Sequence, residues 1–554
     1  MSADTRRPSA CSGDTTAAEP QGRGDRRRVS TLAIALVALS PFAVGAFSII
    51  KRGYPAGALF GDRAILALTA RDAWSAPVLL GAYSRFYWHH PGPLYFYVLN
   101  VLGTIFGGQT VGLVLGATAI NVAAAVGILV LAHRRGGRPL LVWASLLLTA
   151  YMVAIEPIPF DIWNPSVTLL PFVVVLLLAW SVACRDWWAA PWLALVASFA
   201  VQTHVGLVPG VVMALAFAVV VGVWRERRRE VPLGADERRT IHRSVAVSVA
   251  ITVVVWLPPV IQQLTSQDGN LTALARFFTR PGSPHTFGEG ITNTALQATL
   301  MVRGVFEPIS LRADAHQGLV LAVVLSAAAF AVAVAAARRA RATDALVLLI
   351  LVAVELPVGV YAVTHIAGPI QFYLVQWISA VGFVLWLAVG KATIEFARTR
   401  ASDAPQWRTL TRGVGVVVLA ALCLSTIRAF PGDAGRINED LDVPNNRALF
   451  GYVPTAPLLA VTREDRTVVL RLDSVTAWEV MAADALLLEQ HGRRVQVVER
   501  PVTRLLFDDA LLVRRPPSGS QVLAFRDRPR PHLTAGAALV ADQGEWSIVN
   551  LDQT

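Results

Sequence analysis

The residues best suited to chemistry lie close together, between positions 61 and 97 of this 554-residue chain. Asp62 is a carboxylate just beyond an apolar run, and Arg85, His89 and His90 follow it in a stretch rich in aromatic residues. A carboxylate can take a proton from a hydroxyl group, while cations and hydrogen-bond donors can hold a departing phosphate. Arginine suits phosphate because its planar fork presents several donors at once. This stretch therefore contains the residue types that transfer of a sugar from a lipid phosphate to a hydroxyl acceptor needs.

Further polar and aromatic residues stand beside this stretch or at the ends of apolar runs, where they can line the same site. They are Arg63, Tyr83, Trp88, Asp161, Trp163, Asn164, Gln202 and His204. Each also has a structural explanation. Aromatic rings belong at the membrane interface, and Asp or Asn before a helix commonly caps it. The two histidines before Pro91 also suit the start of a helix.

Two other places carry charge in or near apolar segments. Glu355 lies in the middle of an apolar run, where a carboxylate is a functional candidate, and a pairing role in helix packing is equally open. Arg303 and Glu307 are one helix turn apart and predict a solvated ion pair.

The elements that position these residues are membrane helices. The chain is 54% hydrophobic and 16% charged, whereas soluble domains average about 25% charged residues. Its net charge of +11 comes from short basic clusters between apolar runs. Such clusters set membrane topology, so we exclude nucleic acid and expect anionic membrane lipids as the electrostatic partner.

Eleven apolar runs approach or reach the roughly 20 residues that a membrane-spanning helix needs. They lie near 30–50, 110–132, 139–155, 165–183, 188–203, 206–224, 244–264, 317–337, 344–364, 371–390 and 413–429. Residues 1–29 are predicted to be disordered and cytoplasmic. Residues 30–430 are predicted to form the membrane domain.

A further apolar run, 91–108, is shorter, rich in aromatic residues and opens with Pro-Gly-Pro. If it crossed the membrane, the basic cluster at 225–229 and every later one would face outward, against the positive-inside rule. We therefore predict a juxtamembrane helix that lies in the interface, within an outer loop spanning 51–109.

The C-terminal segment, 431–554, alternates strand-like and helix-like stretches and predicts a small α/β domain. Eleven crossings from a cytoplasmic N-terminus place this domain outside the cytoplasm. The three cysteines, Cys11, Cys184 and Cys423, form no disulfide framework and no metal-ligand spacing. The expected protein is an all-α polytopic membrane protein with an extracytoplasmic α/β domain, in a bacterial inner membrane.

The layout of residues 30–430 resembles the GT-C glycosyltransferases. The resemblance is carried by a helix, a loop with Gly61-Asp62, and an aromatic-His-Pro-Gly-Pro-Leu-aromatic segment ending near Tyr97. This family includes membrane mannosyl-, arabinosyl- and aminoarabinosyl-transferases that use polyprenyl-phosphate sugars. The resemblance implies that Asp62 is the catalytic base and that a juxtamembrane helix follows. Two features depart from the pattern: Gly92 is inserted, and Arg63 stands where many members carry a second acid.

The resemblance implies a polyprenyl-phosphate-linked sugar as donor and an envelope glycan, lipid or protein as acceptor. Arg85, His89, His90 and His204 would contact phosphate or sugar, and Trp88 and Trp163 would stack on sugar rings. The missing second acid leaves the requirement for a divalent metal ion open.

Two alternatives remain. A transporter or flippase for a lipid-linked intermediate would carry inverted repeats and midplane polar groups, and the sequence contains no such repeat. A non-catalytic envelope scaffold of the same fold agrees with the missing second acid.

Overall fold

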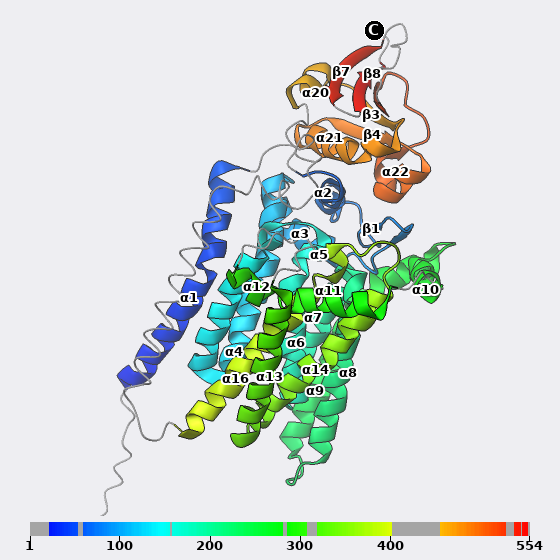
Figure 1. Cartoon of the computed structure of the whole chain (residues 1–554). Helices are drawn as coiled ribbons and strands as arrows, with labels where there is room; N and C mark the ends of the chain where they lie inside the picture. Colours follow the sequence, from blue (N-terminus) through cyan, green and yellow to red (C-terminus); the bar gives the residue numbers. More distant parts are fainter. Residues whose placement is uncertain are drawn as a thin grey trace, which may run out of the picture.

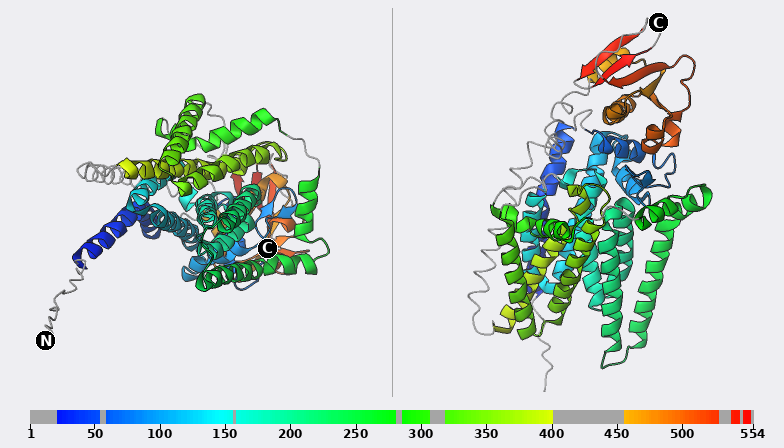
Figure 2. Two further views of the ribbon diagram at one scale, coloured as in Figure 1. Left: turned by 90° about the horizontal axis from the view of Figure 1, so that it is seen from below. Right: turned by 45° about the vertical axis from the view of Figure 1, so that its right-hand side comes forward.

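The computed structural model describes residues 21–53, 59–155, 158–280, 285–306, 318–400, 455–527, 537–543 and 546–551. It consists of a bundle of long helices with a smaller sheet-containing domain at one end (Figure 1). The right-hand view in Figure 2 shows the same division into an elongated bundle and a terminal domain.

Eight helices in the described part of the chain are long and apolar enough to cross a membrane. Seven of them are α1 (Gln21–Arg52), α4 (Thr110–Ala154), α8 (Val208–Arg227), α9 (Ala235–Thr265), α13 (Leu319–Arg339), α14 (Thr343–Thr364) and α16 (Ile378–Arg400). The eighth span, Asn164–Ala183, joins α5 (Asn164–Val167) to α6 (Leu169–Ala183). The protein is therefore a multi-pass membrane protein, as its composition predicts.

Most of the predicted spans correspond to these helices. Helix α4 covers two of them, because Gly137 adopts a positive φ of 67° and breaks the helix into two segments. Helix α7 (Ala189–Thr203) covers the predicted span 188–203, but its 15 residues fall short of the usual crossing length. The predicted span 413–429 lies outside the described residues.

Two boundaries differ from the sequence prediction. Helix α1 begins at Gln21 rather than near residue 30, because arginine is a good helix former and lets the apolar helix extend toward its N-terminus. The predicted span 371–390 is interrupted. The short helix α15 (Phe372–Val375) ends where the backbone N–H of Gln376 bonds back to the carbonyl of Phe372, and α16 begins only at Ile378.

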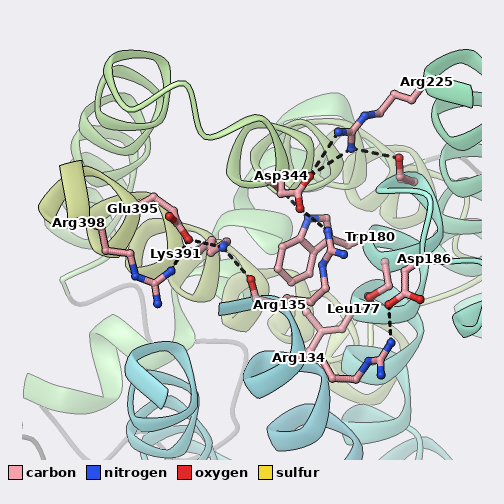
Figure 3. A network of polar contacts seen from close by, with 12 residues as sticks. Arg134, Arg135, Leu177, Trp180, Asp186, Arg225, Asp344, Lys391, Glu395 and Arg398 are labelled. Atoms are coloured by element: carbon pink, nitrogen blue, oxygen red, sulfur yellow. Dashed lines mark hydrogen bonds and ion pairs between the residues drawn. The ribbon is translucent and has the colours of Figure 1, made fainter. Parts of the chain in front are cut away.

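Basic residues from three separate helices meet at the end of the bundle far from the terminal domain (Figure 3). Arg135 and Arg225 both approach the Asp344 carboxylate, at 2.6 and 3.4 Å. Lys391 donates to the carbonyl oxygen of Arg135 at 2.8 Å and pairs with Glu395 at 2.6 Å. The clusters from which the sequence predicts a cytoplasmic face therefore lie together at one end.

The opposite end carries short elements from the first loop and from later connections. These are α2 (Asp62–Asp72), β1 (Tyr83–Ser84), β2 (Trp88–His89), α3 (Leu94–Ile105), α5 (Asn164–Val167), α10 (Asn270–Thr279), α11 (Phe287–Ala298) and α12 (Leu300–Phe306). The 12 residues of α3 span about 18 Å at 1.5 Å per residue, too short for a bilayer core of about 30 Å. Helix α3 therefore fits the predicted juxtamembrane helix.

The C-terminal domain is an α/β domain, as predicted. Its sheet has the strand order β5-β4-β3-β6-β8-β7, with β3 (Thr467–Leu472) parallel to β4 (Arg494–Val498) and β6 (Gln521–Asp527). The remaining elements are α20 (Thr455–Val461), α21 (Trp478–Gln490), α22 (Pro501–Leu506), β5 (Leu512–Val513), β7 (Ala538–Gln543) and β8 (Trp546–Asn550).

The C-terminal domain shares a hydrophobic core with the first loop. Buried side chains of α2, such as Ile65 and Leu68, belong to the same packed cluster as Met481 and Leu487 of α21. Burial of this apolar surface stabilises the contact, so the C-terminal domain packs directly on the helix that begins with Asp62.

Candidate functional site

Asp62 is the first residue of α2, and two donors from distant segments hold its carboxylate. The hydroxyl of Tyr83 in β1 donates to Oδ1, and the indole N–H of Trp163 donates to Oδ2 at 3.1 Å. A carboxylate has about four lone-pair sites, so two remain to receive a proton or a substrate hydroxyl. The side chain is half-buried. Asp62 is therefore oriented as a general base would need to be.

Tyr83 remains protonated at this position. Burial raises the pKa of its hydroxyl well above the ordinary value, and the neighbouring Asp62 carboxylate raises it further. The protonated Tyr83 hydroxyl donates its hydrogen to the Asp62 carboxylate, so the direction of this hydrogen bond is fixed.

The ring of Trp163 connects Asp62 to helix α15. Its centroid lies 5.0 Å from that of Tyr373 and 6.0 Å from that of Phe372. The guanidinium carbon of Arg63 also lies 5.0 Å from the Trp163 ring centroid. Trp163 is thus held by packing as well as by its hydrogen bond.

Arg63 and Asp161 form a buried bidentate pair. Arg63 Nε and Nη2 each donate to one Asp161 oxygen at 2.7 Å, and the two residues are only 7% and 1% exposed. Asp161 also accepts from the backbone N–H of Trp163 at 3.0 Å and from the hydroxyl of Ser166 at 2.9 Å. This arrangement fixes the position of Trp163. It gives Arg63 and Asp161 a structural role, in addition to the substrate-binding role that the sequence predicts for them.

His89 pairs with Tyr83 across the β1–β2 hairpin, and His90 follows directly after β2. The amide of Asn270 in α10 bonds both backbone groups of His89, at 2.8 and 2.9 Å. Burial lowers the pKa of His89 to about 4. The His89 side chain is therefore neutral near pH 7.

His90 and His204 lie against each other, with ring centroids 5.1 Å apart. The backbone N–H of Val205 donates to Nδ1 of His90 at 3.1 Å, which requires that nitrogen to be unprotonated. Burial lowers the pKa of His90 well below 6.5 and that of His204 to about 4. Neither ring nitrogen of His204 has a hydrogen-bond partner in the described part of the chain. His90 and His204 therefore lie together as neutral imidazoles.

Gln202 and Asn164 bridge segments of the backbone. Gln202 donates to the carbonyl of Val255 at 2.8 Å and accepts from the backbone N–H of Leu94 at 3.4 Å. A Cβ at Gly92 would lie 2.4 Å from Gln202 Oε1, so the inserted glycine permits this close approach. Asn164 donates to the carbonyl of Thr203 at 3.0 Å rather than capping α5.

Arg85 and Trp88 lie in an aromatic cluster instead of beside Asp62. The Trp88 ring is within 6.3 Å of Phe86 and within 5.4 Å of Phe277 in α10. The exposed Arg85 guanidinium lies 5.0 Å from the Phe86 ring centroid. The hairpin therefore divides the predicted site into an Asp62 centre and an aromatic–histidine cluster.

Glu355 lies in α14, fully buried, and its carboxylate oxygens have no hydrogen-bond partner within the described ranges. Arg303 in α12 is buried rather than solvated, and Glu307 lies outside the described residues. Over the residues that the structure describes, no group of three or more His, Cys, Asp or Glu side chains is arranged to hold a metal ion.

Sequence reasoning missed three residues around Asp62. They are Tyr373, which packs on Trp163, and Trp478 and Glu479, which come from the C-terminal domain. The Trp478 ring lies edge-on to Tyr83 with centroids 6.0 Å apart, and the carbonyl of Glu479 accepts from the backbone N–H of Gly61 at 3.4 Å. The sequence carries no local signal for contacts between segments so far apart.

No protein-family model matches the sequence, and no curated protein matches it. The solved structures that match along almost the whole chain include two of ArnT. The crystal structure of ArnT from Cupriavidus metallidurans bound to undecaprenyl phosphate has 14% sequence identity and a TM-score of 0.55, and the match covers 96% of this chain and 99% of that chain. ArnT in the apo state gives 15% identity, a TM-score of 0.54 and the same coverage. The chain therefore has the fold of ArnT, the GT-C fold that the layout of its sequence resembles.

Proposed function

We propose that this protein is a membrane glycosyltransferase that moves a sugar from a polyprenyl-phosphate donor to a cell-envelope acceptor. The observation that carries the proposal is the Asp62 carboxylate, held by Tyr83 and Trp163 at the start of α2. The likeness to ArnT bound to undecaprenyl phosphate supports a polyprenyl phosphate as the lipid partner.

In the proposed reaction, Asp62 takes the proton of an acceptor hydroxyl while the hydroxyl oxygen bonds to the anomeric carbon of the sugar. The bond between that carbon and the phosphate oxygen breaks, and polyprenyl phosphate leaves with the bonding electrons. The fixed donors of Tyr83 and Trp163 keep the remaining lone pairs of Asp62 aimed in one direction, which is the positioning that general-base catalysis needs.

The test uses the full chain in lipid nanodiscs with undecaprenyl-phosphate-linked hexoses and pentoses and with isolated envelope fractions as acceptors. We expect the chain to release undecaprenyl phosphate from at least one donor in step with sugar incorporation. If no donor of the panel is consumed while undecaprenyl phosphate does not bind, the transferase proposal fails and the scaffold alternative gains support.

The proposed face of the reaction has its own test. The last residue of α2, Asp72, is exposed. Helix α2 lies at the end of the bundle that carries the C-terminal domain (Figure 1). In a variant whose three native cysteines are serine, we expect Asp72→Cys to react with a membrane-impermeant maleimide added to intact cells. Labelling only after the cells are opened would place the site on the cytoplasmic face.

A further inference from the structure

Helices α2 and α21 lie side by side and run in the same direction. At their first turns, the backbone N–H of Gly61 donates to the carbonyl of Glu479 at 3.4 Å. At their last turns, Arg71 Nη1 lies 2.8 Å from Glu489 Oε2. Asp62 and Glu479 each occupy the first turn of their helix. A carboxylate of the C-terminal domain therefore lies at the end of α2 that holds the proposed base.

The Glu479 side chain lies along Gly61. A Cβ placed on Gly61 would lie 3.5 Å from Glu479 Cγ and 3.6 Å from its carboxyl carbon. The neighbouring Trp478 ring meets the Tyr83 ring edge-on at 6.0 Å. Trp478 thus contacts the Tyr83 ring, and Glu479 contacts the residue directly before Asp62.

The charge of Glu479 acts on the same hydrogen bond. Tyr83 has its pKa raised first by burial, then by Asp62, and also by the Glu479 carboxylate. Two carboxylates repel each other, but the N-terminal ends of α2 and α21 both favour negative charge. The parallel packing of the helices brings these two N-terminal ends together, which offsets part of the electrostatic repulsion between Asp62 and Glu479.

No second acid stands next to Asp62 in the sequence. Arg63 follows Asp62 directly and is committed to Asp161. We propose that Glu479 is a positioning residue for the Tyr83–Asp62 pair, a second carboxylate that the C-terminal domain supplies to the catalytic centre. This inference rests on the proposed transferase function and gives the C-terminal domain a part in the reaction itself.

The experiment separates the charge of Glu479 from simple docking of the C-terminal domain. It compares Glu479→Gln and Glu479→Asp with Glu489→Gln, which removes a carboxylate from the other end of the same helix pair. The readouts are kcat and KM for the undecaprenyl-phosphate sugar that the full chain uses, the pH dependence of kcat, and thermal unfolding in nanodiscs.

We expect Glu479→Gln to lower kcat by about tenfold with KM changed by less than about threefold. The fall of kcat at high pH, the basic limb of the pH profile, should move to lower pH in this variant. The reason is that Tyr83 loses a neighbouring negative charge, which lowers the pKa of its hydroxyl. Glu479→Asp keeps the charge and should recover much of kcat. Glu489→Gln should leave the basic limb in place.

Two results would overturn the inference. One is wild-type kcat and an unmoved basic limb in Glu479→Gln. The other is an equal loss of kcat in Glu489→Gln, which would assign the effect to docking. Asp62→Asn distinguishes this failure from failure of the proposed function: an inactive Asp62→Asn beside a fully active Glu479→Gln removes only the role of Glu479.

Discussion

The indole N–H of Trp163 donates to Asp62 Oδ2 at 3.1 Å, although 101 residues separate the two in the chain. The ring that carries this donor is packed against Tyr373 and lies beside the guanidinium of Arg63. Asp62 is thereby fixed to the membrane bundle as well as to its own loop.

Trp163→Phe should keep most of the ring packing and remove the donor to Asp62. We expect kcat for sugar transfer to fall by about tenfold, because a less oriented base is less effective, while thermal stability changes little. The check is steady-state kinetics beside a thermal unfolding curve. Trp192→Phe, on an exposed ring of α7, is the matched control. An unchanged kcat in Trp163→Phe would show that this hydrogen bond does not position the base.

The Arg63–Asp161 pair should contribute mainly to folding. Removing one partner leaves a buried charge without compensation, so Arg63→Ala should lower the free energy of unfolding by about 3–5 kcal/mol. Arg63→Lys should also destabilise, because an ammonium group cannot make the two parallel bonds to Asp161. Thermal unfolding in nanodiscs measures both effects. A stable but inactive Arg63→Ala would instead assign Arg63 to substrate binding, as the sequence predicts.

Much of the fold could be predicted from local patterns. Apolar runs located helices such as α6 and α14, and basic clusters correctly grouped Arg135 with Arg225 at one end of the bundle. The strand-like and helix-like stretches of the C-terminal domain became β3, α21, β4 and β6. These features follow from period, length and charge within short windows.

The site could be predicted only in part. The sequence identifies both Asp62 and Trp163 as candidate site residues. It carries no pattern that would predict the hydrogen bond between them, because they belong to distant segments. The pairing of Arg63 with Asp161 spans 98 residues, and the Arg71–Glu489 contact spans 418. Such partners depend on how helices pack in three dimensions, and a single sequence shows only the residue types available.

The buried histidines should make stability fall in mild acid. The folded-state pKa of His204 is lowered to about 4 by burial. Between pH 6.5 and 4 the unfolded chain therefore binds a proton that the folded chain does not, so this contribution is complete above pH 6.5 and is lost as pH falls toward 4. His204→Phe should remove it, and the difference in unfolding temperature between the two proteins should change between pH 7 and pH 5. A constant difference would contradict the lowered pKa.

Docking of the C-terminal domain on α2 should have the opposite pH dependence. Burial raises the pKa of Glu489 to about 7, although Arg71 lowers it in part. The docked state holds a proton that the undocked carboxyl gives up above pH 4.5, so this contribution is complete below pH 4.5 and is lost as pH rises through 7. Protease resistance of the C-terminal domain should decline from pH 5 to pH 7 in the wild type. Glu489→Gln should flatten that decline, and an unchanged decline would exclude Glu489 as its source.

The most direct measurement compares kcat for sugar transfer in Asp62→Asn and Asp72→Asn, at the first and last positions of the same helix. Both variants lose one carboxylate from α2, but only Asp62 accepts the bonds from Tyr83 and Trp163. We expect Asp62→Asn to lose at least about 100-fold in kcat and Asp72→Asn to stay within about threefold of wild type. Wild-type transfer by a correctly inserted Asp62→Asn would remove this carboxylate from the reaction.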